Sequence, residues 1–226
     1  MKKIVLILIL AISACSPQKS ITDRVTLTSP DGDLSMEFLL EDGIPMYTLK
    51  HKGTDVLLPS RLGFEIRGSM KSALIRFDGD HITKSDVKPS FLLDRNFELL
   101  CTSNSSFDEY WEPVWGEESS IRNHYHELLV ELKQKESGHL LNIRFRLFDD
   151  GLGFRYEFPD KQRLTHFAIK EELTEFAMAD DCFAWWIPGD YDTQEYEYGE
   201  CKLSEIEENF KEQIWANSSQ TPFSTN

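Results

Sequence analysis

Alternating apolar and polar residues dominate the middle of the chain. Apolar side chains recur at every second position over 128–132, 141–147 and 152–158. The breaks between these runs are Glu136-Ser137-Gly138 and Asp149-Asp150-Gly151. A period of two places successive side chains on opposite faces of a β-strand, and breaks that contain glycine are typical of tight turns. The three runs therefore predict an antiparallel meander with one buried face.

The same alternation begins near residue 34. Leu34, Met36, Phe38 and Leu40 alternate with other residues, and Glu41-Asp42-Gly43 follows as a predicted turn. Two shorter strands are predicted over 47–50 and 56–58, with Lys52-Gly53 between them. Strands that are not interleaved with helices favour an all-β antiparallel sandwich over a parallel α/β sheet.

Helical spacing is confined to the end of the chain. Ile206, Phe210 and Ile214 lie four residues apart, and Ser204 with Glu207 resembles a capping box. The sequence therefore predicts one short helix close to the C-terminus.

The first residues have the pattern of a bacterial export signal. Lys2 and Lys3 precede an apolar run that is too short to span a bilayer, which requires about 20 residues. Ile12-Ser13-Ala14-Cys15 then matches a lipobox, so we expect cleavage after residue 14 and a lipid on Cys15. Residues 15–24 would form a tether and 25–226 a single folded domain. The expected product is an exported lipoprotein, periplasmic or anchored to the outer membrane; an ordinary secretory signal with an incidental cysteine is the alternative.

Composition narrows the range of partners. The chain has 24 basic and 39 acidic residues, a formal net charge of −15, and 15 phenylalanines within a 40% hydrophobic composition. Binding to phosphate backbones needs clustered lysine and arginine, so this balance argues against nucleic-acid binding. After Cys15, only Cys101, Cys182 and Cys201 remain; they allow at most one internal disulfide, and we expect buried thiols instead.

Three segments combine aromatic with acidic or amide residues, and each is a candidate binding surface. Aromatic rings pack on the C–H groups of sugars while carboxylates and amides bind the hydroxyls, but Trp, Tyr and Arg are also the favoured residues of protein interfaces. The sequence leaves both interpretations open. The candidate residues are Trp111, Trp115, Arg122, Asn123, His124, Trp185, Trp186 and Tyr191.

Catalytic and metal-binding patterns are weaker. Adjacent carboxylates such as Asp108/Glu109 point to opposite faces of a strand, so they cannot flank one glycosidic bond. His124 and His126 could point the same way, but no third ligand lies at zinc spacing. Either histidine with Glu127 could form an acid–base pair for sugar mutarotation, an idea that rests on analogy of fold.

Taken in order, several motifs resemble the N-terminal domain of glycoside hydrolase family 97. They are Ser29-Pro30-Asp31-Gly32, Pro59-Ser60-Arg61-Leu62-Gly63, Trp115-Gly116-Glu117, Arg122-Asn123-His124-Tyr125, Phe145-Arg146-Leu147-Phe148-Asp149-Asp150-Gly151, Phe154-Arg155-Tyr156, Glu171-Glu172-Leu173-Thr174-Glu175-Phe176, Ala184-Trp185-Trp186-Ile187-Pro188 and Glu195-Tyr196. The resemblance implies a β-supersandwich like that of galactose mutarotase, preceding a catalytic (β/α)₈ barrel. It also implies an exported α-glucosidase or α-galactosidase that acts on α-glucans or α-galactosides.

The resemblance implies a calcium site as well. In the family the sandwich contributes one glutamate to a calcium ion shared with the barrel, and Glu195 occupies that position. The chain ends at Thr221-Pro222-Phe223-Ser224-Thr225-Asn226, so we expect the last strands of the sandwich and the whole barrel to be missing. The expected function is that of a non-catalytic domain that binds carbohydrate or docks a barrel; the alternative is a stand-alone, surface-anchored carbohydrate-binding module.

Overall fold

The structure is a computed structural model that describes residues 24–67, 77–78, 81–82, 90–159, 167–188 and 196–213. The predicted signal peptide, the lipidation site at Cys15 and all of the predicted tether except Arg24 lie outside the described residues. No helix among the described residues is long and apolar enough to span a membrane.

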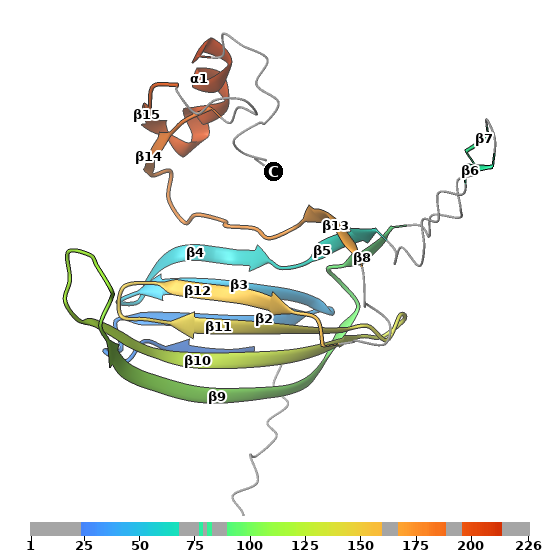
Figure 1. Ribbon diagram of the computed structural model, residues 1–226, viewed down its shortest axis with the longest axis horizontal. Helices are drawn as coiled ribbons and strands as arrows, with labels where there is room; N and C mark the ends of the chain where they lie inside the picture. The colour runs from blue at the N-terminus through green and yellow to red at the C-terminus, as the bar shows by residue number, and fades with distance from the viewer. Residues whose placement is uncertain are drawn as a thin grey trace, which may run out of the picture.

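Two four-stranded antiparallel sheets form the body of the fold (Figure 1). The first sheet runs in sequence order through β1 (Arg24–Thr28), β2 (Leu34–Glu41), β3 (Ile44–His51) and β4 (Thr54–Arg61). The second has the order β12-β11-β10-β9, from β9 (Phe97–Trp111), β10 (Ile121–Gln134), β11 (Leu140–Leu147) and β12 (Leu152–Glu157). The predicted strands and their antiparallel meander are confirmed, and so is the all-β sandwich.

Two hairpin turns of the first sheet need left-handed backbone. Asp42 and Gly43 both have positive φ, and so do Lys52 and Gly53. Two successive residues with positive φ make the turn whose twist matches that of the flanking strands. The sequence had predicted breaks at both places, and glycine at the second position adopts this conformation without a steric penalty.

The core lies between the two sheets. The alternating apolar residues of the predicted meander are all fully buried in β10 and β11. They are Leu128, Val130, Leu132, Leu141, Ile143, Phe145 and Leu147. Phe145 contacts rings from the opposite sheet, with its centroid 6.3 Å from that of Phe38 and 6.2 Å from that of Tyr47. Phe154 of β12 lies 5.4 Å from Tyr47 by the same measure. Burial of these large side chains is the main favourable contribution to folding.

Smaller elements extend the sandwich. A three-stranded sheet of order β13-β5-β8 contains β5 (Phe64–Arg67), β8 (Phe91–Leu93) and β13 (Ala168–Glu172), and β6 (Phe77–Asp78) pairs with β7 (His81–Ile82). The chain after β13 then runs beside β4, where the Leu58 N–H donates to the Ala177 carbonyl and the Ala179 N–H to the Val56 carbonyl. This extended segment protects the edge of β4.

A small unit follows that segment. β14 (Phe183–Trp186) pairs with β15 (Gly199–Lys202), and a 3₁₀ turn (Leu203–Glu205) leads into α1 (Ile206–Gln213). The predicted helix is confirmed, but its capping is different: the Ser204 N–H and hydroxyl both donate to Asp181, while Glu207 pairs with Lys211. The Lys202 N–H also donates to the Glu205 carboxylate, so a local residue and the distant Asp181 together cap this end of the helical segment.

Candidate carbohydrate or catalytic-domain interface

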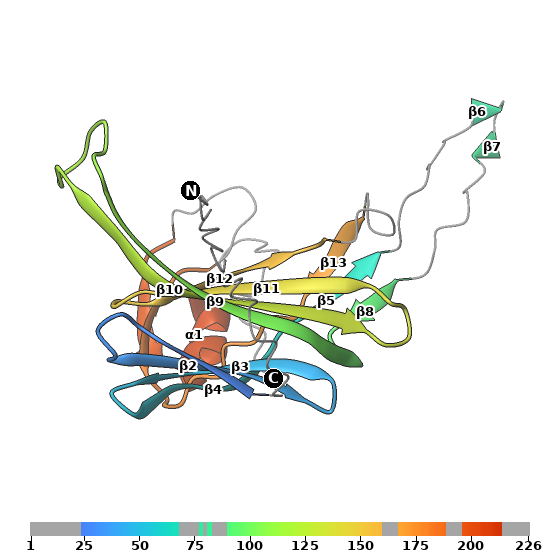
Figure 2. The same cartoon turned by 90° about the horizontal axis from the view of Figure 1, so that it is seen from below.

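The β9–β10 hairpin extends well past the body of the sandwich and curves away from the first sheet (Figure 2). Its two strands pair without interruption from Trp111↔Ile121 to Cys101↔Glu131. β9 is exposed from Ser103 onward, and so is nearly all of the loop that follows. We call residues 103–123 the arm. Because little else packs on the arm, cross-strand pairs hold its shape.

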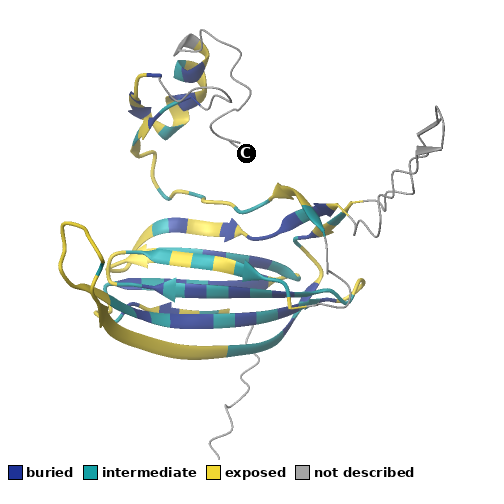
Figure 3. Cartoon of the chain, in the orientation of Figure 1, coloured by how far each residue is buried: buried dark blue, intermediate teal, exposed yellow. Residues whose placement is uncertain are grey.

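Two candidate tryptophans lie on this arm and both are accessible. Trp115, in the loop, is 88% exposed, and Trp111, at the end of β9, is about half exposed. Tyr110 and Val114 are exposed beside them, and nearly the whole tip of the arm is exposed (Figure 3). Flat aromatic faces open to solvent can pack against a sugar ring or against another protein surface.

Arg122 is fixed on one face of the arm. Its Nε and Nη2 atoms donate to the two carboxylate oxygens of Asp108, each at 2.8 Å, and its guanidinium lies 5.7 Å from the Tyr110 ring centroid. The hydrogen bond from Arg122 holds the pKa of Asp108 below its usual range, and the same bond raises the pKa of Arg122. Such a two-pronged pair orients the guanidinium strongly.

Asn123, the last residue of the arm, and His124, the next residue of β10, point to opposite faces of the hairpin, because they are neighbours on a strand. His124 is opposite Asp108 and Asn123 is opposite Glu109. The His124 and His126 rings share a face, with centroids 6.5 Å apart, as the sequence had suggested. The Nδ1 atom of His124 is buried without a hydrogen-bond partner among the described residues. Arg122 and His124 therefore belong to one surface and Asn123 to another.

The Trp185-Trp186 pair also divides between two environments. Trp185 is 69% exposed, whereas Trp186 is only 4% exposed. The Trp186 ring packs on Phe210, its Nε1 donates to the Cys201 sulfur at 3.1 Å, and a Cβ at Gly199 would lie 2.7 Å from the ring. The prediction that Trp186 belongs to a binding surface is wrong, because strand alternation turns it into the small core of this unit.

Two aromatic residues that the sequence analysis did not single out accompany Trp185. Phe183 lies two residues before it on the same face of β14, and Tyr198 immediately precedes β15; both are exposed. A period of two counted from Trp185 would have found Phe183. We call Phe183, Trp185 and Tyr198 the outer aromatic face. All three described cysteines are free thiols, but only Cys201 is buried as expected, since Cys101 is half-buried and Cys182 is exposed near this unit.

Glu127 is not available as an acid–base group. Its carboxylate accepts hydrogen bonds from Arg144 and from Arg146, and Arg144 also pairs with Glu157 at 2.7 Å. Burial raises the pKa of Glu127, but the bonds from Arg146 and Arg144 outweigh that effect and lower the pKa. Because Glu127 is ionised and doubly paired on the face opposite His124 and His126, the mutarotase idea loses its acid–base pair.

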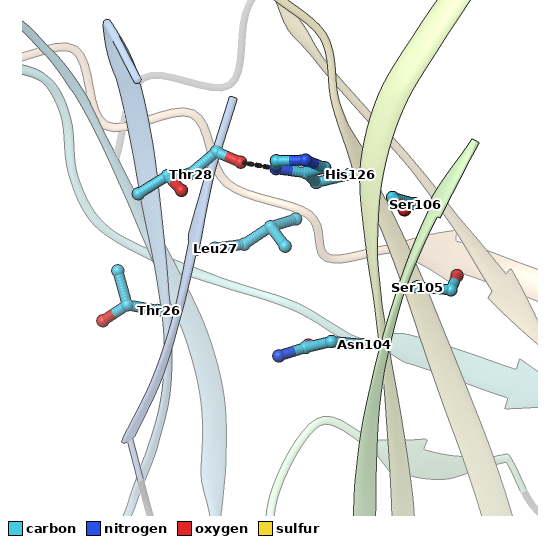
Figure 4. A pocket seen from close by; sticks show the side chains of 7 residues that line it. All are labelled: Thr26, Leu27, Thr28, Asn104, Ser105, Ser106 and His126. Atoms are coloured by element: carbon cyan, nitrogen blue, oxygen red, sulfur yellow. Dashed lines mark hydrogen bonds between the residues drawn. The ribbon is translucent and has the colours of Figure 1, made fainter. Parts of the chain in front are cut away.

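A shallow hollow lies where the edges of the two sheets face each other (Figure 4). It encloses about 390 Å³ between β1 and β9, with Thr26, Leu27 and Thr28 on one side. Asn104, Ser105, Ser106 and His126 line the other side. The His126 Nδ1 lies 2.8 Å from the Thr28 carbonyl oxygen and joins the two walls.

The remaining candidates, Tyr191 and Glu195, lie outside the described residues. Within the described part of the chain, no three His, Cys, Asp or Glu side chains converge in a metal-binding arrangement.

Comparison with known proteins identifies the family to which this domain belongs. The family model described as "Glycosyl-hydrolase 97 N-terminal" matches residues 27–226. The chain belongs to the glycoside hydrolase family 97 N-terminal domains. Membership agrees with the ordered motifs of the sequence and with the antiparallel sandwich.

Solved structures support the same assignment. A family 97 enzyme from Pseudoalteromonas sp. strain K8, solved with panose and also with acarbose, has 28% sequence identity and a TM-score of 0.65. The alignment covers 79% of this N-terminal domain and 24% of the enzyme. A β-arabinopyranosidase at 21% identity, with a TM-score of 0.57 over 74% of this chain and 23% of that one, shares the fold. The domain thus spans about a quarter of the enzymes that it resembles.

Proposed function

We propose that this chain is the non-catalytic β-sandwich domain of an α-glycoside hydrolase of the α-glucosidase or α-galactosidase type, and that it docks a catalytic domain. The observation that carries the proposal is the outer aromatic face. Phe183 and Trp185 are solvent-exposed on a hairpin whose opposite side is already packed with Trp186, Cys201 and Phe210. The small unit has its own core, so these rings do not contribute to it, and exposed aromatic residues in a group are typical of a contact surface.

Three of the described carboxylates are already paired, which supports a non-catalytic role for these three. Asp108 is paired with Arg122, Asp149 accepts the Asp31 N–H, and Glu127 lies between two arginines. A glycosidase needs two carboxyl groups that face one bond with different protonation states. Carboxylates already paired in this way stabilise turns and strands instead.

We propose the oligosaccharide class from the similar enzyme. That enzyme was solved with panose and with acarbose, so an α-glucan is the first substrate to test for the complete protein, and an α-galactoside is the second. The resemblance also supports a calcium ion held partly by Glu195 together with ligands from the catalytic domain. Calcium needs six to eight oxygen ligands, so one glutamate alone would bind it weakly.

The docking proposal is tested by reconstitution. The catalytic part of a family 97 enzyme is produced separately and mixed with this chain, and hydrolysis of p-nitrophenyl α-glucoside is followed with and without calcium. We expect no hydrolysis by the chain alone and increased hydrolysis by the mixture. Trp185→Ala should weaken the effect about tenfold in the concentration required, because truncating an aromatic anchor removes a large contact. Glu195→Gln should reduce the calcium dependence of the mixture.

Leu92→Ala is the control for Trp185→Ala, because Leu92 is an exposed apolar residue of β8 that belongs neither to the outer aromatic face nor to the arm. Failure of the chain to bind or activate any catalytic domain, with its circular dichroism intact, would rule the docking proposal out.

The second candidate function is a stand-alone carbohydrate-binding module, and the exposed tip of the arm favours it. Trp115 and Trp111 provide accessible rings, while Glu112 and Glu117 lie nearby in sequence. Titration of panose or maltooligosaccharides, followed by tryptophan fluorescence, tests this function with the chain alone. A saturable change that Trp115→Ala abolishes supports a binding module; no change at millimolar sugar contradicts it.

Export as a lipoprotein is part of the same proposal. The lipobox that ends at Cys15 supports it, and the lipid would hold the domain at the periplasmic side of a membrane or in the outer membrane. A Cys15→Ala variant should move from the membrane fraction to the soluble fraction of the producing cell. Equal partition of the two proteins would contradict lipid anchoring.

A further inference from the structure

β9 has one edge without a partner along most of its length. In the order β12-β11-β10-β9 it is the last strand, and no other described segment forms a backbone hydrogen bond with residues 101–111. On its other edge, this stretch of eleven residues pairs regularly with β10, because the one shift in register lies before it, between Glu131 and Leu132 of β10. An unpaired edge presents a row of N–H and C=O groups that can bind another strand.

The first part of this edge lacks the usual protection against such pairing, and Asp108 and Glu109 are the charged residues of the rest. The segment Cys101-Thr102-Ser103-Asn104-Ser105-Ser106-Phe107 contains no charge, no proline and no glycine. Natural edge strands are commonly protected by lysine, by proline or by a covering segment, as the chain after β13 covers β4. Within the described ranges, β9 therefore presents an uncovered strand edge, in a chain whose net charge of −15 otherwise opposes association.

We propose that this edge binds β9 of a second copy of the chain, in antiparallel orientation, with the symmetry axis at Ser106. The strand has two unlike halves. Residues 101–105 have small, uncharged side chains, and residues 107–111 are Phe, Asp, Glu, Tyr and Trp. Antiparallel pairing of β9 with itself places each half opposite the other, so every large side chain faces a small one.

The charges also favour this register. Asp108 would lie opposite Asn104 of the second copy and Glu109 opposite Ser103, so no acidic side chain faces another. Asp108 is already paired with Arg122 in its own chain, which reduces its repulsion further. A symmetry axis at Ser103 would instead place Asp108 opposite Glu98, and like charges in direct opposition destabilise a sheet.

The hollow beside β9 accommodates part of the second copy. Asn104 and Ser106 line it, and Tyr110 belongs to the same face of the strand because it follows at even spacing. In the proposed register, Tyr110 of the second copy lies opposite Thr102 and diagonal to Asn104, next to the hollow. Its exposed ring would then be partly buried against Leu27, with hydroxyl and amide groups near the phenol.

The test uses the full chain and a residue at the symmetry axis. Light scattering after size exclusion should give twice the 26.2 kDa mass of the chain at high concentration. Ser106→Lys should weaken the dimer about tenfold or more, because the two lysines would face each other, and Ser106→Glu should do the same. An equimolar mixture of the two variants should form a heterodimer at least as tight as the unmodified dimer.

The mixture makes the test specific, because a substitution that merely damaged the fold could not be rescued by a second damaged chain. Thr48→Lys on β3, a strand that is paired along both edges, is the matched control and should leave the dimer unchanged. A monomer at all concentrations up to about 100 μM would overturn the proposal. It would also be overturned if Ser106→Lys dimerised normally, or if the mixture of lysine and glutamate variants failed to associate.

Discussion

Replacing Glu127 with glutamine should destabilise the domain strongly, although Glu127 lies on the outer face of a sheet. Its side chain is only 11% exposed and its two oxygens accept from Arg144 and Arg146. Glutamine has nearly the same volume, so Glu127→Gln removes the charge and leaves the packing almost unchanged. The variant therefore isolates the electrostatic contribution of this carboxylate.

The expected loss of stability depends on the interactions that Arg144 and Arg146 retain in the variant. Breaking a buried pair by removing one partner costs about 3–5 kcal/mol, because the remaining charge is left without compensation. Here Arg144 retains Glu157 at 2.7 Å, and the Arg146 side chain is 39% exposed and reaches water. Both features reduce the cost, so we expect a loss of about 2 kcal/mol in the free energy of unfolding.

Urea denaturation followed by circular dichroism measures this loss. With a denaturant slope of about 2 kcal/mol/M, the midpoint should fall by about 1 M. Asp108→Asn is the matched control: Asp108 is also paired with an arginine, but its side chain is 48% exposed, and its midpoint should hardly change. If Glu127→Gln shifted the midpoint no more than Asp108→Asn, the reasoning from burial would be refuted.

Three further predictions concern the pH dependence, the core and the small unit. The pKa of Glu127 is lowered below its ordinary value of 4.5, so the stabilisation by its ionised carboxylate should be fully present above that pH. This stabilisation should be lost as the pH falls through the folded-state pKa of Glu127. The difference in unfolding free energy between the unmodified chain and Glu127→Gln should therefore shrink in acid, and a constant difference would contradict this. Phe145→Ala should cost about 3–5 kcal/mol in chemical denaturation, because the fully buried ring joins the two sheets, whereas Phe107→Ala, at an exposed site, should cost much less. Gly199→Ala should destabilise the β14–β15 unit by about 1–3 kcal/mol, because its Cβ would overlap the Trp186 ring; tryptophan fluorescence of thermal unfolding would show the loss, and unchanged unfolding would mean that the ring can move aside.

The strands and most of the core follow from local patterns along the chain. A period of two in side-chain polarity identifies a strand and the face that it buries, and the glycine-containing turns are local features. The alternating apolar residues of β10 and β11 between Leu128 and Leu147 are therefore buried, as predicted. The ordered motifs were likewise sufficient to identify the family, because their order does not depend on how the strands pair.

The accessibility of the aromatic residues depends on how distant segments pack together. Trp185 and Trp186 are adjacent and chemically identical, yet one is exposed and the other packs on Phe210, because β15 and α1 cover one face of β14. Glu127 looked like a free carboxylate until Arg144 and Arg146 of the next strand were placed beside it. Exposure and ion pairing depend on contacts between segments far apart in the chain, and a local pattern carries no information about the segment that will pack against it.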